Sequence, residues 1–266
     1  MNCQNRKIYG KITLFYLIYI GKLMASREIY YEEGRFSISY EIINPSKETA
    51  IVILHGWGSN KEIMRQAFGK RLPNYKHIYI DMPGFGRSSN DMVLETIDYA
   101  IIIQRFLNQI HIKADIVMGH SFGGKVATLM DTPHLVLLSS SGILVPKPLT
   151  VKLKIAFTKS LKSIGLGGVT NILKSRDVEG MSHTMYQTFK HIVDEKFEDN
   201  FSHSKSKALL FWGKDDTATP LWTAKKIDEL IPNSTLYPLD GDHFFFLNHS
   251  EFISETIERS FKNDIS

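Results

Sequence analysis

The hydrophobic and polar positions of this chain follow two alternating patterns from Arg27 onward. Short apolar runs, of which Ala50–Leu54 is typical, have the continuous hydrophobicity of strands that are buried on both faces. Similar runs predict further strands at His77–Ile80, Asp115–Met118, Leu135–Leu138 and Ala208–Trp212, with a last strand at Ser234–Leu239. Between them, helical patterns cover Lys61–Leu72, Met92–Ile110, Gly124–Met130 and Leu221–Ile231. This alternation predicts an α/β fold with a mostly parallel central sheet flanked by helices.

Two segments depart from that alternation. Glu28–Tyr31 and Arg35–Ile43 alternate polar with apolar residues on either side of Glu33-Gly34, which predicts an antiparallel hairpin. Residues 143–206 contain no convincing strand and look helical, although they lie between two sheet strands. We therefore expect a helical cap at 143–206, inserted into a core formed by residues 24–142 and 207–266.

The predicted cap carries one apolar stripe. Met181, Met185 and Phe189 fall at positions i, i+4 and i+8, so they share one face of a helix. This face either lines a substrate pocket beneath the cap or simply packs the cap on the body. The spacing alone leaves both interpretations open.

Composition indicates an ordinary globular protein. The 266 residues are 43% hydrophobic and 23% charged, which is unlike a disordered, collagen-like or coiled-coil chain. The single cysteine, Cys3, excludes a disulfide framework and a cysteine-based zinc site, and it is typical of a cytoplasmic protein.

The net charge of +4 belongs entirely to the first 23 residues. They carry four of the 32 Lys and Arg residues and none of the 28 Asp and Glu residues, so the other 243 residues are balanced. A neutral body has no electrostatic footprint for nucleic acid, and we expect no nucleic-acid partner.

This leader, residues 1–23, also has an apolar centre. Ile12–Ile20 is a nine-residue run that is apolar apart from Thr13, whereas a membrane-spanning helix needs about 20 apolar residues. Basic residues precede the run as in a signal peptide, but Leu23 stands where cleavage near Leu23-Met24-Ala25 would need a small residue. We interpret residues 1–23 as upstream sequence before a true start at Met24, or as a mobile extension. The alternative is a weak signal or membrane-surface segment.

The strongest chemical signal is Gly119-His120-Ser121-Phe122-Gly123-Gly124. It follows a predicted strand and precedes a predicted helix, the context of a nucleophile held on a sharp turn. Small residues two positions before and two after Ser121 let the chain reverse without a clash. Such a turn exposes the Ser121 hydroxyl near the free N–H groups of the helix N-terminus, so we expect Ser121 to be a catalytic nucleophile.

A serine nucleophile needs a base and a group that orients the base. Asp215 and Asp216 follow the predicted strand Ala208–Trp212, and His243 follows the last strand, which matches the chain order Ser, Asp, His of this kind of turn. We expect His243 to be the base and one of the two aspartates to be the orienting acid. An oxyanion hole needs two backbone donors, which we expect from Phe122 and from Trp57 in the loop after Ala50–Leu54.

Four motifs in this order resemble the α/β-hydrolase superfamily, specifically its small lidded serine hydrolases. They are HGWG (55–58), DMPGFGRS (81–88), GHSFGG (119–124) and the paired GKDD and GDH loops, and the resemblance covers roughly residues 35–262. It implies that residues 143–206 are a cap over the active site. It also selects Asp216 over Asp215, because the family's acid usually stands three residues after the glycine that follows the strand.

The resemblance implies a hydrolase that works through an acyl-enzyme on a carboxylic ester or thioester. The HGWG loop and the turn predicted at Ser121 resemble those of carboxylesterases such as the carrier-protein methyl ester esterase of biotin synthesis. Seven basic residues and no acid in the first half of the cap would suit an acidic carrier protein, or they form a solvated face. They are Lys147, Lys152, Lys154, Lys159, Lys162, Lys174 and Arg176.

Two other functions remain open. The layout also resembles hydrolases that cleave a carbon–carbon bond in 2-hydroxy-6-oxo-dienoates, a keto-acid substrate. Those usually have asparagine before the serine and tryptophan after the histidine, where this chain has His120 and Phe244. A non-catalytic binding relative of the fold is the second alternative, although no member of the triad is lost. No phosphate-binding loop, dinucleotide motif or HExxH motif appears, so we expect no cofactor and no metal.

Overall fold

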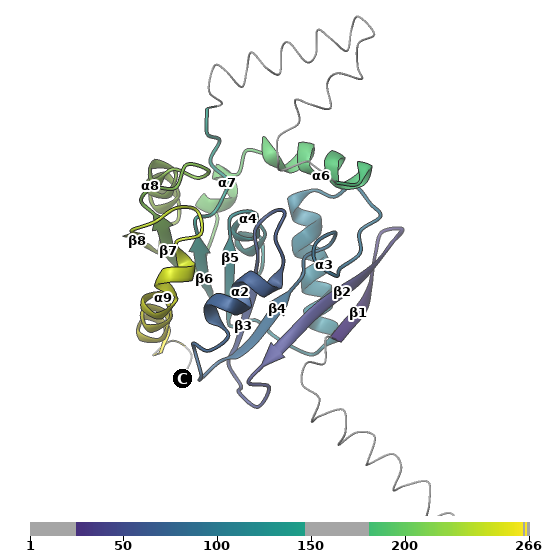
Figure 1. Ribbon diagram of the computed structural model, residues 1–266, viewed down its shortest axis with the longest axis horizontal. Coiled ribbons are helices and arrows are strands. Elements are labelled where there is room, and N and C mark those ends of the chain that lie inside the picture. Colours follow the sequence, from purple (N-terminus) through teal and green to yellow (C-terminus); the bar gives the residue numbers. More distant parts are fainter. Residues whose placement is uncertain (1–24, 147–180, 263, 265–266) are drawn as a thin grey trace, which may run out of the picture.

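The structure is a computed structural model of the chain, and it describes residues 25–146, 181–262 and 264. The whole predicted leader, residues 1–23, and residues 147–180 of the predicted cap, with its seven basic residues, therefore lie outside the described residues. In the described part, three strands come first, and strands and helices then alternate along the chain except for two successive helices at residues 183–202 (Figure 1). The strands are β1 (Ala25–Tyr31), β2 (Gly34–Ile43), β3 (Ala50–Leu54), β4 (Lys76–Ile80), β5 (Ile116–His120), β6 (His134–Leu138), β7 (Lys207–Gly213) and β8 (Ser234–Leu239). The helices are α2 (Lys61–Phe68), α3 (Thr96–Gln109), α4 (Phe122–Thr128), α6 (His183–Val193), α7 (Glu198–Ser202), α8 (Leu221–Leu230) and α9 (Phe246–Phe261).

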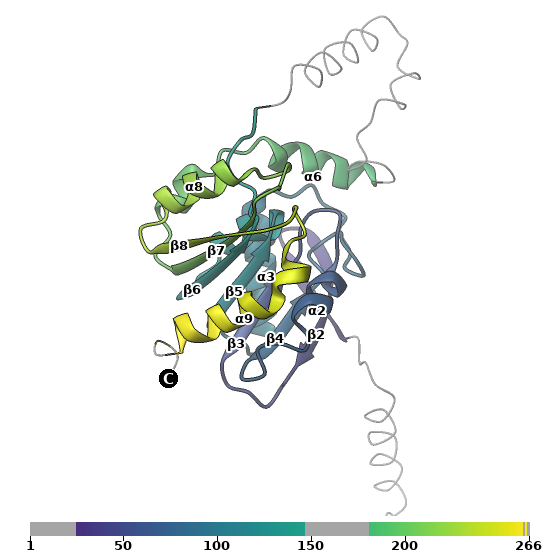
Figure 2. The same cartoon turned by 60° about the vertical axis from the view of Figure 1, so that its left-hand side comes forward.

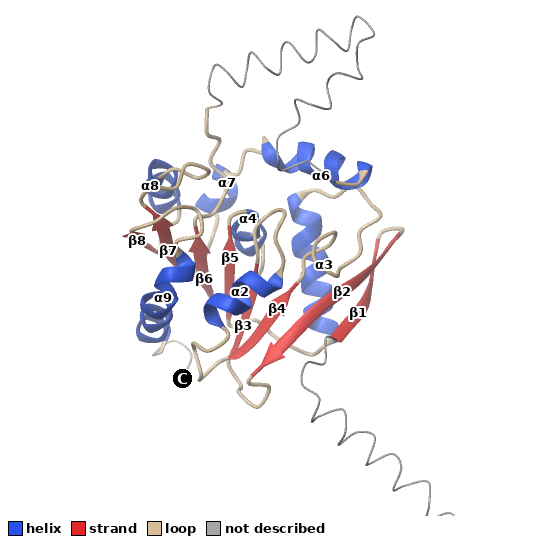
Figure 3. Cartoon of the chain, in the orientation of Figure 1, coloured by secondary structure: helices blue, strands red, loops and turns tan. Residues whose placement is uncertain are grey.

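The eight described strands form one sheet in the order β1-β2-β4-β3-β5-β6-β7-β8 (Figure 3). β1 pairs antiparallel with β2, and β2 pairs antiparallel with β4, whereas every pairing from β4 to β8 is parallel. The predicted mostly parallel sheet flanked by helices is confirmed, and so is the hairpin that forms its antiparallel edge.

Each face of the sheet carries its own hydrophobic core. In β3, Ala50, Val52 and Leu54 belong to the core beneath α3, α4 and α8. Ile51 and Ile53 point to the other face, where the core includes residues of α2 and α9. Figure 2 shows α2 and α9 together on the near side of the sheet. The apolar run Ala50–Leu54 is therefore continuous because successive side chains enter two different cores.

Several helix boundaries differ from the predicted ones, and the three that follow are among them. α2 ends at Phe68 rather than Leu72. Gly69 is its C-cap residue, and Leu72 has a positive φ of 50°, which no helix residue adopts. α3 begins at Thr96 rather than Met92, because Glu95 and Asp98 form a capping box at its first turn. α4 begins at Phe122, two residues earlier than predicted, directly after Ser121.

The carboxyl ends of the parallel strands face the described part of the predicted cap. Figure 1 shows α6 above this edge of the sheet, with α7 between α6 and α8. Buried contacts hold α6 on the body, since Thr188 accepts a hydrogen bond from the Leu94 N–H at 3.1 Å. Among the described residues, no helix is both long enough and apolar enough to cross a membrane.

Candidate active site

Ser121 lies at the sharp turn between β5 and α4. Its backbone has φ 51° and ψ −115°, a conformation that residues with a side chain rarely adopt. The turn is held on both sides, because the Ser121 N–H donates to the Leu138 carbonyl at 3.0 Å and the Ser121 carbonyl accepts from the Ser141 N–H at 3.1 Å. This strain is of the kind that is stored at functional sites, where the surrounding structure holds it in place.

Glycine is required on both sides of this turn by close backbone approach. A β-carbon on Gly119 would lie 2.1 Å from the carbonyl oxygen of Gly123. A β-carbon on Gly123 would lie 2.5 Å from the carbonyl oxygen of His55. Since backbone atoms cannot move aside as a flexible side chain can, the two small residues that the motif predicts are a steric necessity here.

The structure brings His243 and Asp216 together. The loop after β8 carries His243, and the loop after β7 carries Asp216, with 2.7 Å between His243 Nδ1 and Asp216 Oδ2. Asp215, one residue earlier, is exposed. With Nδ1 engaged by a carboxylate, Nε2 is the ring nitrogen of His243 that is left to accept a proton.

The Asp216 carboxylate is surrounded by donors. Oδ1 accepts hydrogen bonds from the backbone N–H groups of Ala218 at 2.8 Å and Thr219 at 2.9 Å. Oδ2 accepts the Thr219 hydroxyl at 2.8 Å in addition to His243. Burial raises the pKa of Asp216. The hydrogen bond from His243, the charge of His243 and the hydrogen bond from the Thr219 N–H outweigh burial and lower this pKa to about 2. Asp216 therefore remains a carboxylate throughout the pH range in which a protein of this kind works.

This lowered pKa predicts a specific pH dependence of stability. Because the folded-state pKa lies below the unfolded value of about 3.9, the contribution of Asp216 is complete above pH 4 and is lost as the pH falls toward 2. The difference in free energy of unfolding between wild type and Asp216→Asn should therefore shrink from pH 5 to pH 2. Urea unfolding at several pH values measures it, with Asp215→Asn as the exposed control. A difference that is constant from pH 7 to pH 2 would contradict this prediction.

Trp57 and Phe122, the two predicted oxyanion donors, lie beside Ser121. The N–H of Phe122 is the first of α4, so it has no carbonyl one turn earlier in the helix to bond. The ring of Trp57 packs edge-on against Phe122 and Phe85, with centroid distances of 5.5 and 4.7 Å. His55, two residues before Trp57, fixes the start of this loop, because its Nε2 accepts the Met82 N–H at 3.1 Å and its Nδ1 bonds the Gly56 carbonyl at 2.8 Å.

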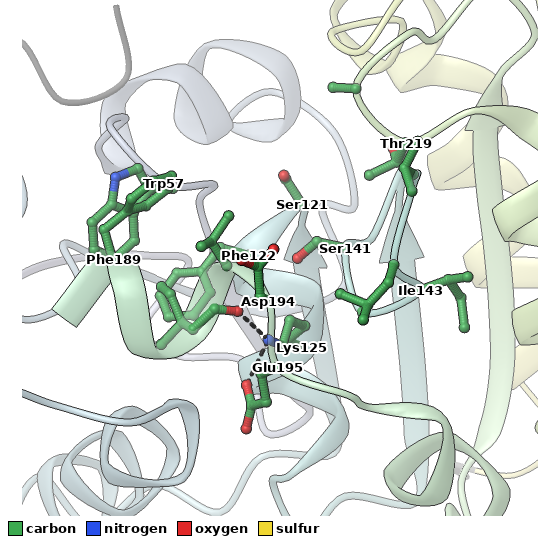
Figure 4. A pocket seen from close by; sticks show the side chains of 16 residues that line it. Trp57, Ser121, Phe122, Lys125, Ser141, Ile143, Phe189, Asp194, Glu195 and Thr219 are labelled. Atoms are coloured by element: carbon green, nitrogen blue, oxygen red, sulfur yellow. Dashed lines mark hydrogen bonds and ion pairs between the residues drawn. The ribbon is translucent and has the colours of Figure 1, made fainter. Parts of the chain in front are cut away.

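A cavity of about 320 Å³ opens in front of Ser121. This volume is at the lower end of the range for small-molecule sites. Figure 4 shows Ser121 in its wall, between Trp57 and Phe122 on one side and Thr219 on the other. Most of the other described lining residues are apolar: Ile143, Leu144, Val145, Phe189, Ile192, Val193 and Ala218.

An ion pair lies at the far end of this cavity. Lys125, one turn after Ser121 on α4, is 2% exposed, and its ammonium lies 2.5 Å from Glu195 and 2.9 Å from the Ile192 carbonyl (Figure 4). Glu195 also accepts the Thr96 hydroxyl at 2.5 Å. Burial lowers the pKa of Lys125, and the hydrogen bond and charge of Glu195 oppose that shift. The pair connects α4 to the segment after α6.

The predicted cap stripe divides between two surroundings. Phe189 lines the cavity and packs against Trp57 with ring centroids 5.3 Å apart. Met185 instead packs on the body, where its sulfur lies 3.4 Å from Asn90 Nδ2. Met181 packs against the core beneath α3 and α4, and neither methionine is among the described residues that line the cavity. The prediction of one helix face for all three is wrong for Met181, because α6 begins at His183 after the N-cap Ser182. Met185 and Phe189 do lie one turn apart on α6, and of the three only Phe189 reaches the cavity.

Three residues with evident roles at the site were not singled out from the sequence. Thr219 donates to Asp216, and the only signal for it is its position three residues after that acid. Lys125 is a charged residue in a helix of small and apolar residues, which is a signal of a buried ion pair, whereas nothing in the sequence identifies Glu195 as its partner. His120 is the third, because its Nε2 lies 2.9 Å from the backbone carbonyl oxygen of His243.

The sequence matches the model of the "Alpha/beta hydrolase family" over residues 51–256. A curated relative is an "Uncharacterized hydrolase YugF" of Bacillus subtilis (strain 168), 24% identical over 246 residues, which are 80% of this chain and 90% of the relative. Another is a "Pimeloyl-[acyl-carrier protein] methyl ester esterase" of Aliivibrio fischeri (strain MJ11), 25% identical over 245 residues, which are 80% of this chain and 93% of the relative.

Solved structures share the fold at low sequence identity. An esterase (EaEST) from Exiguobacterium antarcticum superposes with a TM-score of 0.70 at 22% identity, covering 90% of this chain and 100% of that chain. A thermophilic esterase from Thermogutta terrifontis gives a TM-score of 0.71 at 14% identity, covering 91% of this chain and all of the other.

Proposed function

We propose, from the premise that the chain belongs to the α/β-hydrolase family, that it cleaves carboxylic esters or thioesters through an acyl-enzyme on Ser121. The observation that carries this proposal is the 2.7 Å contact between Asp216 and His243 on loops at the edge of the sheet where Ser121 occupies its strained turn. The relatives that are named as hydrolases and esterases support the same reaction class.

The reaction would use each group in a single role. His243 Nε2 accepts the Ser121 proton as Oγ attacks the carbonyl carbon, and Asp216 stabilises the imidazolium that forms. The N–H groups of Trp57 and Phe122 stabilise the oxyanion. His243 then gives its proton to the leaving alkoxide or thiolate, which departs and leaves the acyl-enzyme. Water, deprotonated by His243, attacks this intermediate in turn and releases the acid with restoration of Ser121.

The apolar lining of the cavity favours the acyl chain of an ester over a charged keto acid. Ile143, Phe189 and Ile192 offer dispersion contacts along its wall, and burying an apolar chain there is favourable by about 25 cal/mol per Å². Two charged side chains at its far end, Lys125 and Glu195, already form an ion pair with each other. An acyl carrier protein is a partner that the names of the methyl ester esterase relatives suggest for such an ester, and we include it in the proposal as the carrier of the acyl group.

A direct comparison of substrates tests the proposal. We expect kcat/KM for short p-nitrophenyl esters to exceed that for a 2-hydroxy-6-oxo-dienoate by orders of magnitude, with the full chain as the enzyme. The same acyl group is then offered as its free methyl ester and as its acyl-carrier-protein thioester, to determine whether a carrier improves turnover. A dienoate that is cleaved faster than every ester would replace this proposal with carbon–carbon bond hydrolysis.

A further inference from the structure

His120 is a buried histidine that the proposed reaction does not use. It is the last residue of β5 and immediately precedes Ser121, and its side chain is almost completely inaccessible. Its ring lies against those of His243, Phe244 and Phe246, with centroid distances of 4.6, 5.4 and 4.8 Å. It is not among the described residues that line the cavity, so it is not placed to contact a substrate there.

One hydrogen bond determines the protonation of this ring. His120 Nε2 lies 2.9 Å from the backbone carbonyl oxygen of His243. A carbonyl oxygen can only accept, so Nε2 must carry a hydrogen and donate it. Nδ1 is buried and has no hydrogen-bond partner among the described residues, and a β-carbon on Gly56 would lie only 2.9 Å from it. A proton on Nδ1 would be a buried cation without a partner, which favours the neutral ring.

The pKa of His120 agrees with that geometry. Burial in the first place, and repulsion from His243 in the second, lower it to about 3. Asp216 and the hydrogen bond to the His243 carbonyl act in the opposite direction, and the buried ring of His55 adds a small lowering. His120 therefore presents the same Nε2–H donor at every pH at which the enzyme works.

The bond connects the base to the nucleophile through the backbone. His243 lies in the loop between β8 and α9, where other hydrogen bonds tie the loop to itself or to the loop after β7. Phe245 N–H donates to the Asp242 carbonyl at 3.1 Å, and Asp215 N–H donates to the Gly241 carbonyl at 3.0 Å. The His120 bond instead holds the backbone of His243 itself, and it does so from the residue that adjoins Ser121. It thus limits how far Ser121 and the His243 ring can move apart.

We propose that His120 is a positioning residue, whose Nε2–H group holds the His243 backbone so that the imidazole stays within reach of the Ser121 hydroxyl. The inference rests on the proposed function, in which His243 is the base. Asp216 fixes the orientation of the ring through Nδ1, and His120 fixes the point in the backbone from which the ring extends. Together they restrain the two ends of the same side chain, and displacements of about 1 Å at such a site cost up to about 100-fold in rate.

The test compares side chains that keep or remove the donor. His120→Gln places an amide N–H near the position of Nε2, whereas His120→Met fills the same space without a donor. Full-length variants react with a fluorophosphonate, in which Ser121 Oγ forms a bond to phosphorus and fluoride leaves, so no natural substrate is needed. We expect His120→Met to slow this labelling by about 10- to 100-fold. We expect His120→Gln to recover most of the rate.

Ester hydrolysis supplies the second readout. The loss in His120→Met should appear in kcat with KM nearly unchanged, because His120 is not among the described residues that line the cavity. Phe246→Leu is the matched control, because it alters the packing against the His120 ring and leaves the donor in place. It should lower the melting temperature and leave the labelling rate close to that of wild type. If His120→Met does not fold, His120→Asn takes its place, because its shorter amide cannot reach the His243 carbonyl.

Distinct outcomes separate this inference from the proposed function. Wild-type labelling that disappears in Ser121→Ala, with His120→Met slow and His120→Gln fast, supports both. Labelling of His120→Met at the wild-type rate overturns the positioning role alone, and so does an equal loss in His120→Met and His120→Gln, which would assign the effect to ring packing. A wild-type chain that neither labels nor hydrolyses esters overturns the proposed function, and this inference with it.

Discussion

Replacing Ser121 with alanine is expected to reduce ester hydrolysis by about a millionfold, down to the rate that binding and the oxyanion donors alone sustain. The hydroxyl is the only part of the residue that the change removes, so the turn, the cavity and the Asp216–His243 pair should persist. Steady-state hydrolysis of a p-nitrophenyl ester measures the loss, and fluorophosphonate labelling of the purified variant confirms which serine reacts.

Ser141 is the matched control for this variant. It lines the same cavity, and its contact with Ser121 is made by its backbone N–H, which Ser141→Ala leaves in place. We expect Ser141→Ala to hydrolyse esters at a rate close to that of wild type. Substantial activity in Ser121→Ala, or a comparable loss in Ser141→Ala, would move the nucleophile away from the turn after β5.

Ser121→Gly separates the chemistry from the strain at the same position. Glycine adopts φ 51°, ψ −115° without the steric cost of a β-carbon, and such strain amounts to about 1–3 kcal/mol. The greater freedom of glycine in the unfolded chain offsets about 0.4–1 kcal/mol of this. The glycine variant should thus be inactive, as the alanine variant is, and should melt at or above the wild-type temperature.

The parts of the fold that were predictable are those with a local cause. Ala50–Leu54 is a strand with the predicted bounds because each of its side chains enters a core on one face or the other. Ser234–Leu239 also has its predicted bounds. Ser121 on a turn between a strand and a helix was predictable because the glycine spacing answers a steric requirement of the turn itself.

Features that depend on distant partners were not predictable from the sequence. The segment before α3 is not helical, although its apolar spacing continues the helix, because the Leu94 N–H bonds Thr188 on α6 and Glu95 begins the capping box. The partnership of Lys125 with Glu195 joins residues 70 positions apart in the sequence. His120 gave no sequence signal for its contact with the His243 carbonyl, because the geometry of that contact arises only when β5 and the loop after β8 lie side by side.

Asp216→Asn is expected to lower kcat by about 10,000-fold, whereas Asp215→Asn should have little effect. The asparagine oxygen can still accept the backbone N–H groups of Ala218 and Thr219, so the loop keeps its shape. Its amide N–H then faces His243 Nδ1, where the carboxylate accepted before. Nδ1 must become the bare nitrogen, and the ring proton moves to Nε2, which can no longer accept a proton from Ser121.

The neighbouring aspartate makes this prediction sharp. Asp215→Asn removes the same charge and changes the same number of atoms one residue earlier, but its side chain is exposed, whereas Asp216 is buried. Long-range loss of negative charge would therefore affect both variants, whereas a change of tautomer would affect Asp216→Asn alone. Rates of ester hydrolysis and of fluorophosphonate labelling should fall together in Asp216→Asn, since both need Nε2 as a base. A larger loss in Asp215→Asn would transfer the orienting role to that residue, and equal small losses would leave His243 without a required carboxylate.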